Sequence, residues 1–211
     1  MTDKCFLEEL KLLGITPSPK QLSQLEKYYN LLVEWNNKVN LTRITTKEEV
    51  YLKHFYDSLT IKKIIDLNDY HTLCDIGTGA GFPGIVLKIF YPHLDITLVD
   101  AREKKLKFLD EVISKLELTN IKTLHIRAEE YNEKFDIVTA RAVANISKLL
   151  DYTMHLVKKN GKLIALKGDI DSELTDEVQK QINNKYQIEE IIKFNLPIEN
   201  SKRSLISIKI K

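Results

Sequence analysis

The sequence predicts an α/β fold in which a seven-stranded, mostly parallel sheet with one antiparallel strand follows an N-terminal helical extension. Short apolar runs alternate with helical patterns from about residue 71 onwards, which is typical of βαβ units. Four of the seven glycines cluster directly after the first apolar run, where a strand turns into a helix. The last two runs are joined by a turn around residues 197–201, which indicates a hairpin.

Length and composition fit one globular domain with an appendage. The chain has 211 residues, of which 43% are apolar and 29% charged, so wholesale disorder and low-complexity arrays are excluded. Its 32 basic and 30 acidic residues give a net charge of +2, which is too small to indicate nucleic-acid binding by itself. We place the helical extension at residues 1–66 and the α/β domain at residues 67–211.

Cysteine, histidine and apolar patterns argue against disulfides, a metal centre and a membrane segment. The two cysteines, Cys5 and Cys74, form no CxxC pair, and the five histidines lack metal-ligand spacing. The first residues include acidic side chains where a signal peptide needs an apolar run, and no stretch of about 18 apolar residues occurs. We therefore expect a cytoplasmic protein without a metal ion, and the absence of heptads makes a monomer the default.

The extension is expected to be helical. Ser18 and Gln21 form a capping box with Pro19 at the first helical position, and apolar residues then fall on one helical face. A second capping box is predicted between Thr46 and Glu49, where it opens an apolar helical segment.

The α/β domain follows from seven apolar runs and the helical patterns between them. Strands are predicted over residues 72–76, 96–99, 122–126, 136–140, 162–167, 187–194 and 205–210. Helices are predicted over residues 85–91, 106–116 and 146–157. The hairpin formed by the last two strands makes one of them antiparallel to the rest.

The glycine cluster fits two kinds of ligand. Residues 79–84 match GxGxxG, the dinucleotide fingerprint, whereas residues 75–81 match the DxGxGxG loop with which methyltransferases bind S-adenosylmethionine. Both patterns expect an acidic residue after the next strand to bind ribose hydroxyls, and Asp100 supplies it for either. Asp75 favours the methyl donor, because a nearby carboxylate attracts an ammonium or sulfonium and repels a pyrophosphate.

Seven separated motifs, in order, resemble one family. They are Trp35-Asn36 with residues 40–42, His54 with Asp57-Ser58, the loop ending at residues 81–84, Val99-Asp100 with residues 104–105 and 108–109, residues 127–130 with 135–136, residues 139–142, and residues 166–168. On these motifs the chain resembles the RsmG (GidB) family, the bacterial 16S rRNA guanine-N7 methyltransferases. The resemblance implies a Rossmann-like class I S-adenosylmethionine-dependent methyltransferase fold.

Together with the residue patterns, the resemblance implies a binding site for S-adenosylmethionine, with S-adenosylhomocysteine as the product and no metal. The expected cofactor-binding residues are Asp75, Gly77, Gly79, Gly81, Phe82, Asp100, Ala128, Glu129 and Arg141. Several of them have structural alternatives: core packing for Phe82, an N-cap completed by Glu103 for Asp100, and a solvated helix start for Glu129.

Arg141 and Lys167 are expected to position the reactants, because Arg141 follows one predicted strand and Lys167 ends another at the carboxyl edge of the sheet, where ligands of open α/β sheets bind. A structural salt bridge is the alternative for Arg141, and a solvated side chain is the alternative for Lys167. Asp136 is expected to be structural. RNA contacts are predicted at Arg102, Lys104, Lys105, Lys167 and Arg203.

The reaction implied by the resemblance is methyl transfer to N7 of guanine 527 in 16S rRNA, presented as naked RNA, in a 30S particle or in an assembly intermediate. Guanine N7 carries a lone pair and no proton, so no general base is needed, and no catalytic acid–base group is predicted. Three alternatives remain: a methyltransferase of another RNA, a protein or a small molecule; a nicotinamide-dependent oxidoreductase; and a non-catalytic RNA-binding domain.

Overall fold

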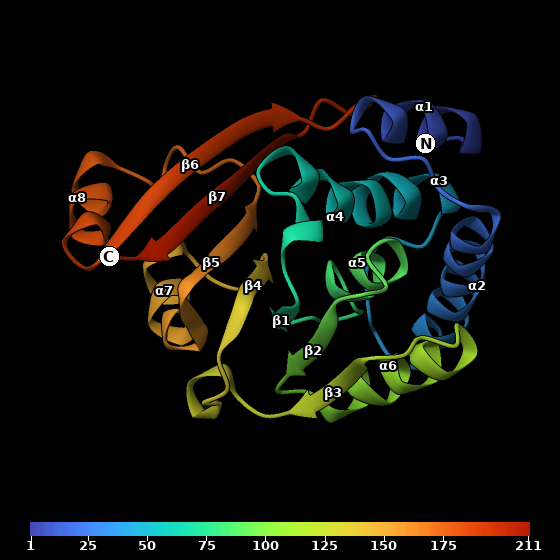
Figure 1. The fold of residues 1–211 in the computed structure, drawn as a ribbon. Coiled ribbons are helices and arrows are strands. Elements are labelled where there is room, and N and C mark those ends of the chain that lie inside the picture. The colour runs from blue at the N-terminus through green and yellow to red at the C-terminus, as the bar shows by residue number, and fades with distance from the viewer.

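The seven predicted strands form a single sheet in the order β3-β2-β1-β4-β5-β7-β6 (Figure 1). This computed structural model describes all residues from Met1 to Lys211. The strands are β1 (Thr72–Ile76), β2 (Asp95–Asp100), β3 (Ile121–His125), β4 (Phe135–Arg141), β5 (Val157–Lys167), β6 (Tyr186–Asn195) and β7 (Lys202–Ile210). The first five are parallel, and β7 runs antiparallel to both of its neighbours, which confirms the predicted sheet.

The strand order reverses between β1 and β4. The chain moves outwards from β1 to β2 and β3, then returns to place β4 on the other side of β1. In open parallel sheets a crevice forms at such a reversal, outside the carboxyl ends of the strands. The glycine cluster follows β1 and Arg141 ends β4, so both lie at this point.

Helices cover both faces of the sheet. They are α1 (Asp3–Leu12), α2 (Pro19–Asn36), α3 (Lys47–Val50), α4 (Asp57–Leu59), α5 (Gly84–Phe90), α6 (Glu103–Lys115), α7 (Ile146–Thr153) and α8 (Asp176–Lys185). A π-helix, η1 (Tyr51–Tyr56), joins α3 to α4. None of these helices is both long enough and apolar enough to cross a bilayer.

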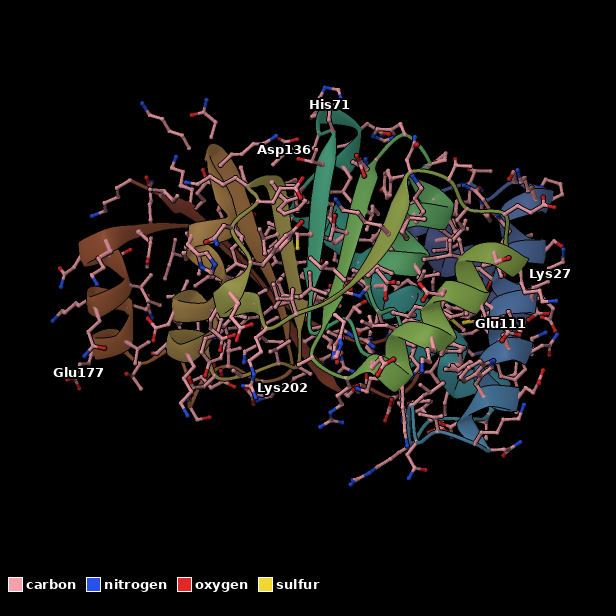
Figure 2. The ribbon with its side chains drawn as sticks, turned by 90° about the horizontal axis from the view of Figure 1, so that it is seen from below. Lys27, His71, Glu111, Asp136, Glu177 and Lys202 are labelled. Carbon is pink, nitrogen blue, oxygen red and sulfur yellow. The ribbon has the colours of Figure 1, made fainter.

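Alternate residues of the strands face two separate apolar cores. Leu73 belongs to a core of 38 buried residues that the extension shares with α5 and α6, whereas Cys74 belongs to a core of 20 beneath α7 and α8. The indole of Trp35 at the end of α2 donates to Glu111 on α6 at 3.0 Å, and Figure 2 shows α2 lying beside α6. The extension completes the larger core and thereby lies against the sheet. Some of its side chains, such as Thr42 and Lys53, therefore reach the crevice at the sheet edge.

The structure corrects several local predictions. The Ser18–Gln21 capping box is present, but the Thr46 hydroxyl donates to the Glu49 carboxylate and caps no backbone N–H. Asp100 is not the N-cap of α6: Arg102 occupies that position, and Glu103 pairs with Lys107. The predicted helix over 146–157 ends at Thr153, and Val157 begins β5.

Candidate functional site

The loop after β1 is bent by three glycines in the left-handed region. Gly77, Gly79 and Gly81 have φ angles of 63°, 61° and 94°, which other residues rarely adopt. The Asp100 carboxylate at the end of β2 accepts hydrogen bonds from the backbone N–H groups of Gly79 and Arg102, both at 2.9 Å. One carboxylate therefore fixes both the glycine loop and the entry to α6.

Asp75 supports the same loop from behind. Its side chain is fully buried, and its oxygens accept hydrogen bonds from the Gly84 N–H at 3.1 Å and the Thr139 hydroxyl at 2.9 Å. Burial raises the pKa of this carboxyl to about 6. Asp75 lines neither of the cavities at the loop, and the contacts that the structure shows for it are with the loop and with Thr139.

Two cavities meet at Gly77. The smaller, of about 180 Å³, holds the predicted cofactor residues Asp100, Ala128 and Glu129. The larger, of about 450 Å³, holds Gly79, Phe82, Lys105, Arg141, Lys167 and Arg203. Gly77 borders both, and a Cβ there would lie 2.8 Å from the Val143 side chain. An elongated ligand can therefore lie across the bare backbone at Gly77 with one end in each cavity.

Gly81 lines neither cavity and acts through packing. A Cβ at this position would lie 2.5 Å from the Tyr28 hydroxyl and 2.7 Å from Ile85. The buried Tyr28 hydroxyl in turn donates to the Ala80 carbonyl of the loop. Tyr28 was not predicted as a site residue, because its loop partner lies 52 residues further along the chain.

An ion cluster at the larger cavity joins three distant parts of the chain. Arg141 Nη1 donates to Asp57 Oδ2 at 3.1 Å and to the Lys53 carbonyl at 2.9 Å. Arg203 Nε donates to the other oxygen of Asp57 at 2.9 Å. The Asp57 side chain is only 9% exposed, and this one carboxylate pairs with two largely buried guanidinium groups, so the cluster keeps a net positive charge. The salt-bridge alternative for Arg141 is therefore present in the structure, within the cavity.

Asp57 was not predicted as a site residue. The available signal was a carboxylate within an apolar helical stretch, since charged residues are rarely buried without a partner. The π-helix η1 leads directly into Asp57 and carries Lys53 and His54, which both contact Arg141. π-helical turns occur frequently at functional sites.

Phe82 packs inside a polar group of side chains. Its ring stacks on His54 with centroids 4.3 Å apart, and the Arg141 guanidinium lies 5.2 Å from the ring centroid. His54 is nearly buried, and its Nε2 lies 3.0 Å from the Thr42 hydroxyl. Burial, assisted by the Arg141 charge, lowers the pKa of His54 to about 3. The imidazole is therefore neutral at physiological pH and a weak base.

This buried, neutral histidine predicts a pH-dependent stability. Below pH 6.5 the unfolded chain binds a proton at His54 that the folded chain cannot bind, so folding becomes less favourable as the pH falls. We therefore expect the free energy of unfolding of the wild type, measured relative to that of His54→Gln, to fall by about 1.4 kcal/mol per pH unit below 6.5. The fall reaches about 2 kcal/mol by pH 5. Urea unfolding of both proteins from pH 7.5 to 5 measures this difference. A difference that does not change with pH would show that His54 protonates in the folded protein.

The predicted basic residues differ in their surroundings. Lys167 Nζ pairs with Glu173 at 2.7 Å, and its side chain is only 7% exposed, so the solvated alternative is wrong. The guanidinium of Arg203 forms an ion pair with Asp57. In contrast, no carboxylate forms an ion pair with Lys105, which reaches the larger cavity from the first turn of α6.

Other singled-out residues lie away from the two cavities. Asp136 accepts hydrogen bonds from the His71 and Thr72 N–H groups and pairs with Lys158, which confirms its structural role. Figure 2 shows His71 and Asp136 together at one end of the sheet, with Lys202 towards the other. Cys74 is buried, and both cysteines are free. No group of three His, Cys, Asp or Glu side chains is arranged to hold a metal ion.

The fold resembles those of solved methyltransferases. A structure described as a SAM-dependent methyltransferase from Aquifex aeolicus superposes with a TM-score of 0.59 at 16% identity, covering 84% of this chain and 98% of that one. TrmN from Thermus thermophilus gives a TM-score of 0.58 at 12% identity, covering 76% of this chain and 53% of that one. These similarities confirm the predicted Rossmann-like class I methyltransferase fold.

Sequence comparison gives a narrower relationship. The family described as "rRNA small subunit methyltransferase G" matches residues 21–206. The protein named "Ribosomal RNA small subunit methyltransferase G" of Bacillus subtilis is 46% identical, over 97% of this chain and 88% of that protein. Its namesake in Oceanobacillus iheyensis is 48% identical, over 100% of this chain and 92% of that protein. The family match and these relatives show that the chain belongs to the rRNA small subunit methyltransferase G (GidB) family.

Proposed function

We propose that this protein transfers a methyl group from S-adenosylmethionine to N7 of guanine 527 in 16S rRNA, by direct in-line attack. The observation that carries the proposal is the pair of cavities meeting at Gly77, outside the carboxyl ends of β1 and β4. Membership of the rRNA methyltransferase family supports RNA as the acceptor. Atom N7 and nucleotide 527 rest on the resemblance alone.

The residues of the smaller cavity suit a nucleoside. We assign the ribose hydroxyls to the Asp100 carboxylate, which still has lone pairs beyond its two backbone hydrogen bonds. Ala128 and Glu129 would border the adenine ring. The amino-acid end of the cofactor would cross Gly77 towards Gly79 and the larger cavity, where Arg141 lies.

The larger cavity suits the acceptor base. The cofactor supplies an electrophilic methyl group on a sulfonium. Transfer of this methyl group would join it to the N7 lone pair as the methyl–sulfur bond breaks, and it would leave the guanine cationic. No proton moves, so a weakly basic His54 and the lack of an acid–base pair are compatible with this chemistry. The protein contributes alignment, which is worth roughly 7–11 kcal/mol when two bound reactants are well positioned.

Four of the five cations that line this cavity have a carboxylate partner, which suits a product that gains positive charge; Lys105 has none, so we place N7 away from it. An unpaired cation close to N7 would oppose the reaction. Arg141 and Lys167 each carry a carboxylate partner, Asp57 and Glu173 respectively. We therefore assign Arg141 and Lys167 to positioning; Glu173 offsets the charge of Lys167, and Asp57, which Arg141 shares with Arg203, offsets part of the charge of Arg141.

Replacing Asp100 with alanine is expected to weaken S-adenosylmethionine binding about 100-fold. The change removes two charge-assisted hydrogen bonds to the ribose, each worth about 1.5 kcal/mol. Asp95→Ala is the matched control, because Asp95 is an exposed aspartate at the opposite end of the same strand. Isothermal titration calorimetry measures both affinities. Equal affinities for S-adenosylmethionine in the two variants would show that Asp100 does not bind the cofactor.

The same titration distinguishes the cofactor classes. We expect S-adenosylmethionine to bind and NADH not to bind. Binding of NADH alone would favour the nicotinamide oxidoreductase, which the GxGxxG match at residues 79–84 also allows.

The acceptor is tested with 16S rRNA and with 30S subunits that lack the modification, using labelled S-adenosylmethionine. Nuclease digestion and mass spectrometry then locate the label, which we expect on guanine N7 at position 527. Label on a different RNA, or on a protein, would support the corresponding alternative.

A further inference from the structure

A second basic surface adjoins the larger cavity. A groove of about 460 Å³, which we call the α6 groove, lies between Lys38–Asn40 of the extension and Arg102–Lys105 at the start of α6. Lys105 lines both this groove and the larger cavity, so the two adjoin at this side chain. Four of the seven residues that line the groove are cationic and one is acidic.

The cations of the α6 groove are largely free. No ion pair in the structure involves Arg102, Lys104 or Lys105, and both Arg102 and Lys104 are exposed. The groove's one carboxylate, Glu103, pairs with Lys107 outside the groove, at 3.0 Å. Lys38 pairs with Glu34 at 3.3 Å, but both side chains are at least 60% exposed, so this pair is weak.

A groove on the other side of the larger cavity has a different charge balance. This hairpin groove, of about 300 Å³, is formed by Asp169, Asp171 and the ends of β6 and β7, and it shares Phe194, Arg203 and Ser204 with the larger cavity. Each of its cations already has a carboxylate partner. The pairs are Lys193 with Asp171, Lys202 with Asp169 and Arg203 with Asp57. The hairpin groove therefore offers little net attraction to a phosphate.

We propose that the RNA strand flanking the target base runs through the α6 groove, where its phosphates contact Arg102, Lys104 and Lys38, and that it avoids the hairpin groove. Phosphate contacts of this kind release counterions and act independently of base sequence. Lys105 links the strand to the base in the larger cavity. This inference rests on the proposed RNA methylation. It adds Lys38 to the predicted RNA contacts and replaces Arg203 and Lys167, whose charges are paired inside the protein.

Two double variants of equal charge change test the proposed path. Arg102→Gln/Lys104→Gln removes two charges from the α6 groove, and Lys193→Gln/Lys202→Gln removes two from the hairpin groove. Each phosphate contact to single-stranded RNA makes the plot of log affinity against log salt concentration steeper by about 0.7, and it strengthens binding about 5-fold at 0.1 M salt. The first variant should therefore bind 16S rRNA roughly 25-fold more weakly, with a salt slope shallower by about 1.4. Its KM for RNA should rise to match, with kcat unchanged.

The hairpin variant should stay within about 2-fold of the wild type. The hairpin variant leaves the carboxylates of Asp169 and Asp171 unpaired, so it would repel RNA if RNA passed through this groove. An unchanged affinity would therefore show that RNA does not approach the hairpin groove. Filter binding across a salt series and methylation kinetics measure these effects on 16S rRNA and on 30S subunits. Unchanged S-adenosylmethionine affinity in both variants verifies that the cofactor site is intact.

The outcomes separate the two proposals. A wild-type protein that methylates no 16S rRNA, free or in 30S subunits, would refute the proposed function and with it this path. If the wild type is active, equal losses in both variants, or a loss confined to the hairpin variant, would refute the path alone. An effect seen with 30S subunits but absent with bound naked rRNA would also refute the path, since the groove would then not contact the RNA strand beside the target base in the naked complex.

Discussion

Replacing Asp57 with alanine is expected to lower the free energy of unfolding by about 3–5 kcal/mol, because it leaves two largely buried guanidinium groups without a counterion. The side chains of Arg141 and Arg203 are only 16% and 22% exposed, and Asp57 is the carboxylate that pairs with both. Methyl transfer should fall as well, since both arginines line the larger cavity. Urea unfolding at pH 7.5 and labelled methyl transfer measure the two effects.

Glu189→Ala is the matched control for this change. Glu189 also bridges two cations, Lys162 at 2.8 Å and Lys209 at 3.0 Å, but it lies on the sheet away from the cavities. Its lysine partners are 29% and 38% exposed, so water can solvate them, and we expect a loss of at most about 1 kcal/mol. Similar losses in the two variants would mean that burial does not strengthen the Asp57 cluster.

Replacing Gly81 with alanine is expected to destabilise the protein by about 2–4 kcal/mol and to weaken cofactor binding at least 10-fold. Overpacking a filled site costs about 1–3 kcal/mol, and a left-handed backbone adds about 1 kcal/mol for alanine. The new methyl group would lie within 2.8 Å of Tyr28, Ile85 and Leu109 at a φ of 94°. Because these neighbours form the wall behind the glycine loop, relief of the clash must displace the loop.

Gly14→Ala separates backbone strain from the clash. Gly14 has a φ of 72°, but no atom lies within 4 Å of the position where its Cβ would stand. We expect a loss of about 1 kcal/mol and unchanged affinity for S-adenosylmethionine. Thermal and urea unfolding measure the two losses. A loss in the free energy of unfolding for Gly81→Ala no larger than that for Gly14→Ala would show that Tyr28 does not pack closely against the loop.

The sheet was predictable because its apolar runs are local signals. Six of the seven predicted strands match within three residues at each end, since turn residues border them. β5 begins five residues earlier than predicted, because polar residues such as Lys158 and Asn160 extend the strand where no apolar pattern marks it. Helix α8 was missed for a related reason: Ile182 is its one buried residue, so it shows little apolar periodicity.

The candidate site was predictable only in part. Glycines and acidic residues after strands are local patterns, and they led to Gly77, Gly79 and Asp100. The partners of Arg141 come from the π-helical region, and no sequence pattern indicated that Asp57 would meet it 84 residues away. Charge pairing also decides which cations remain free, so Lys104 and Arg203 look alike in sequence although one is exposed and the other is bound to Asp57.

The cluster around Asp57 also determines at which stage of folding the mouth of the larger cavity forms. Its contacts span 84 residues to Arg141 and 146 residues to Arg203. Contacts that close such long loops carry a large entropy cost, and they form after the local ones during folding. The parallel strands β1 to β4 pair over shorter separations, so they can assemble before the mouth of the cavity exists. The binding surface is thus a late product of folding, present only while the first and last thirds of the chain are docked together.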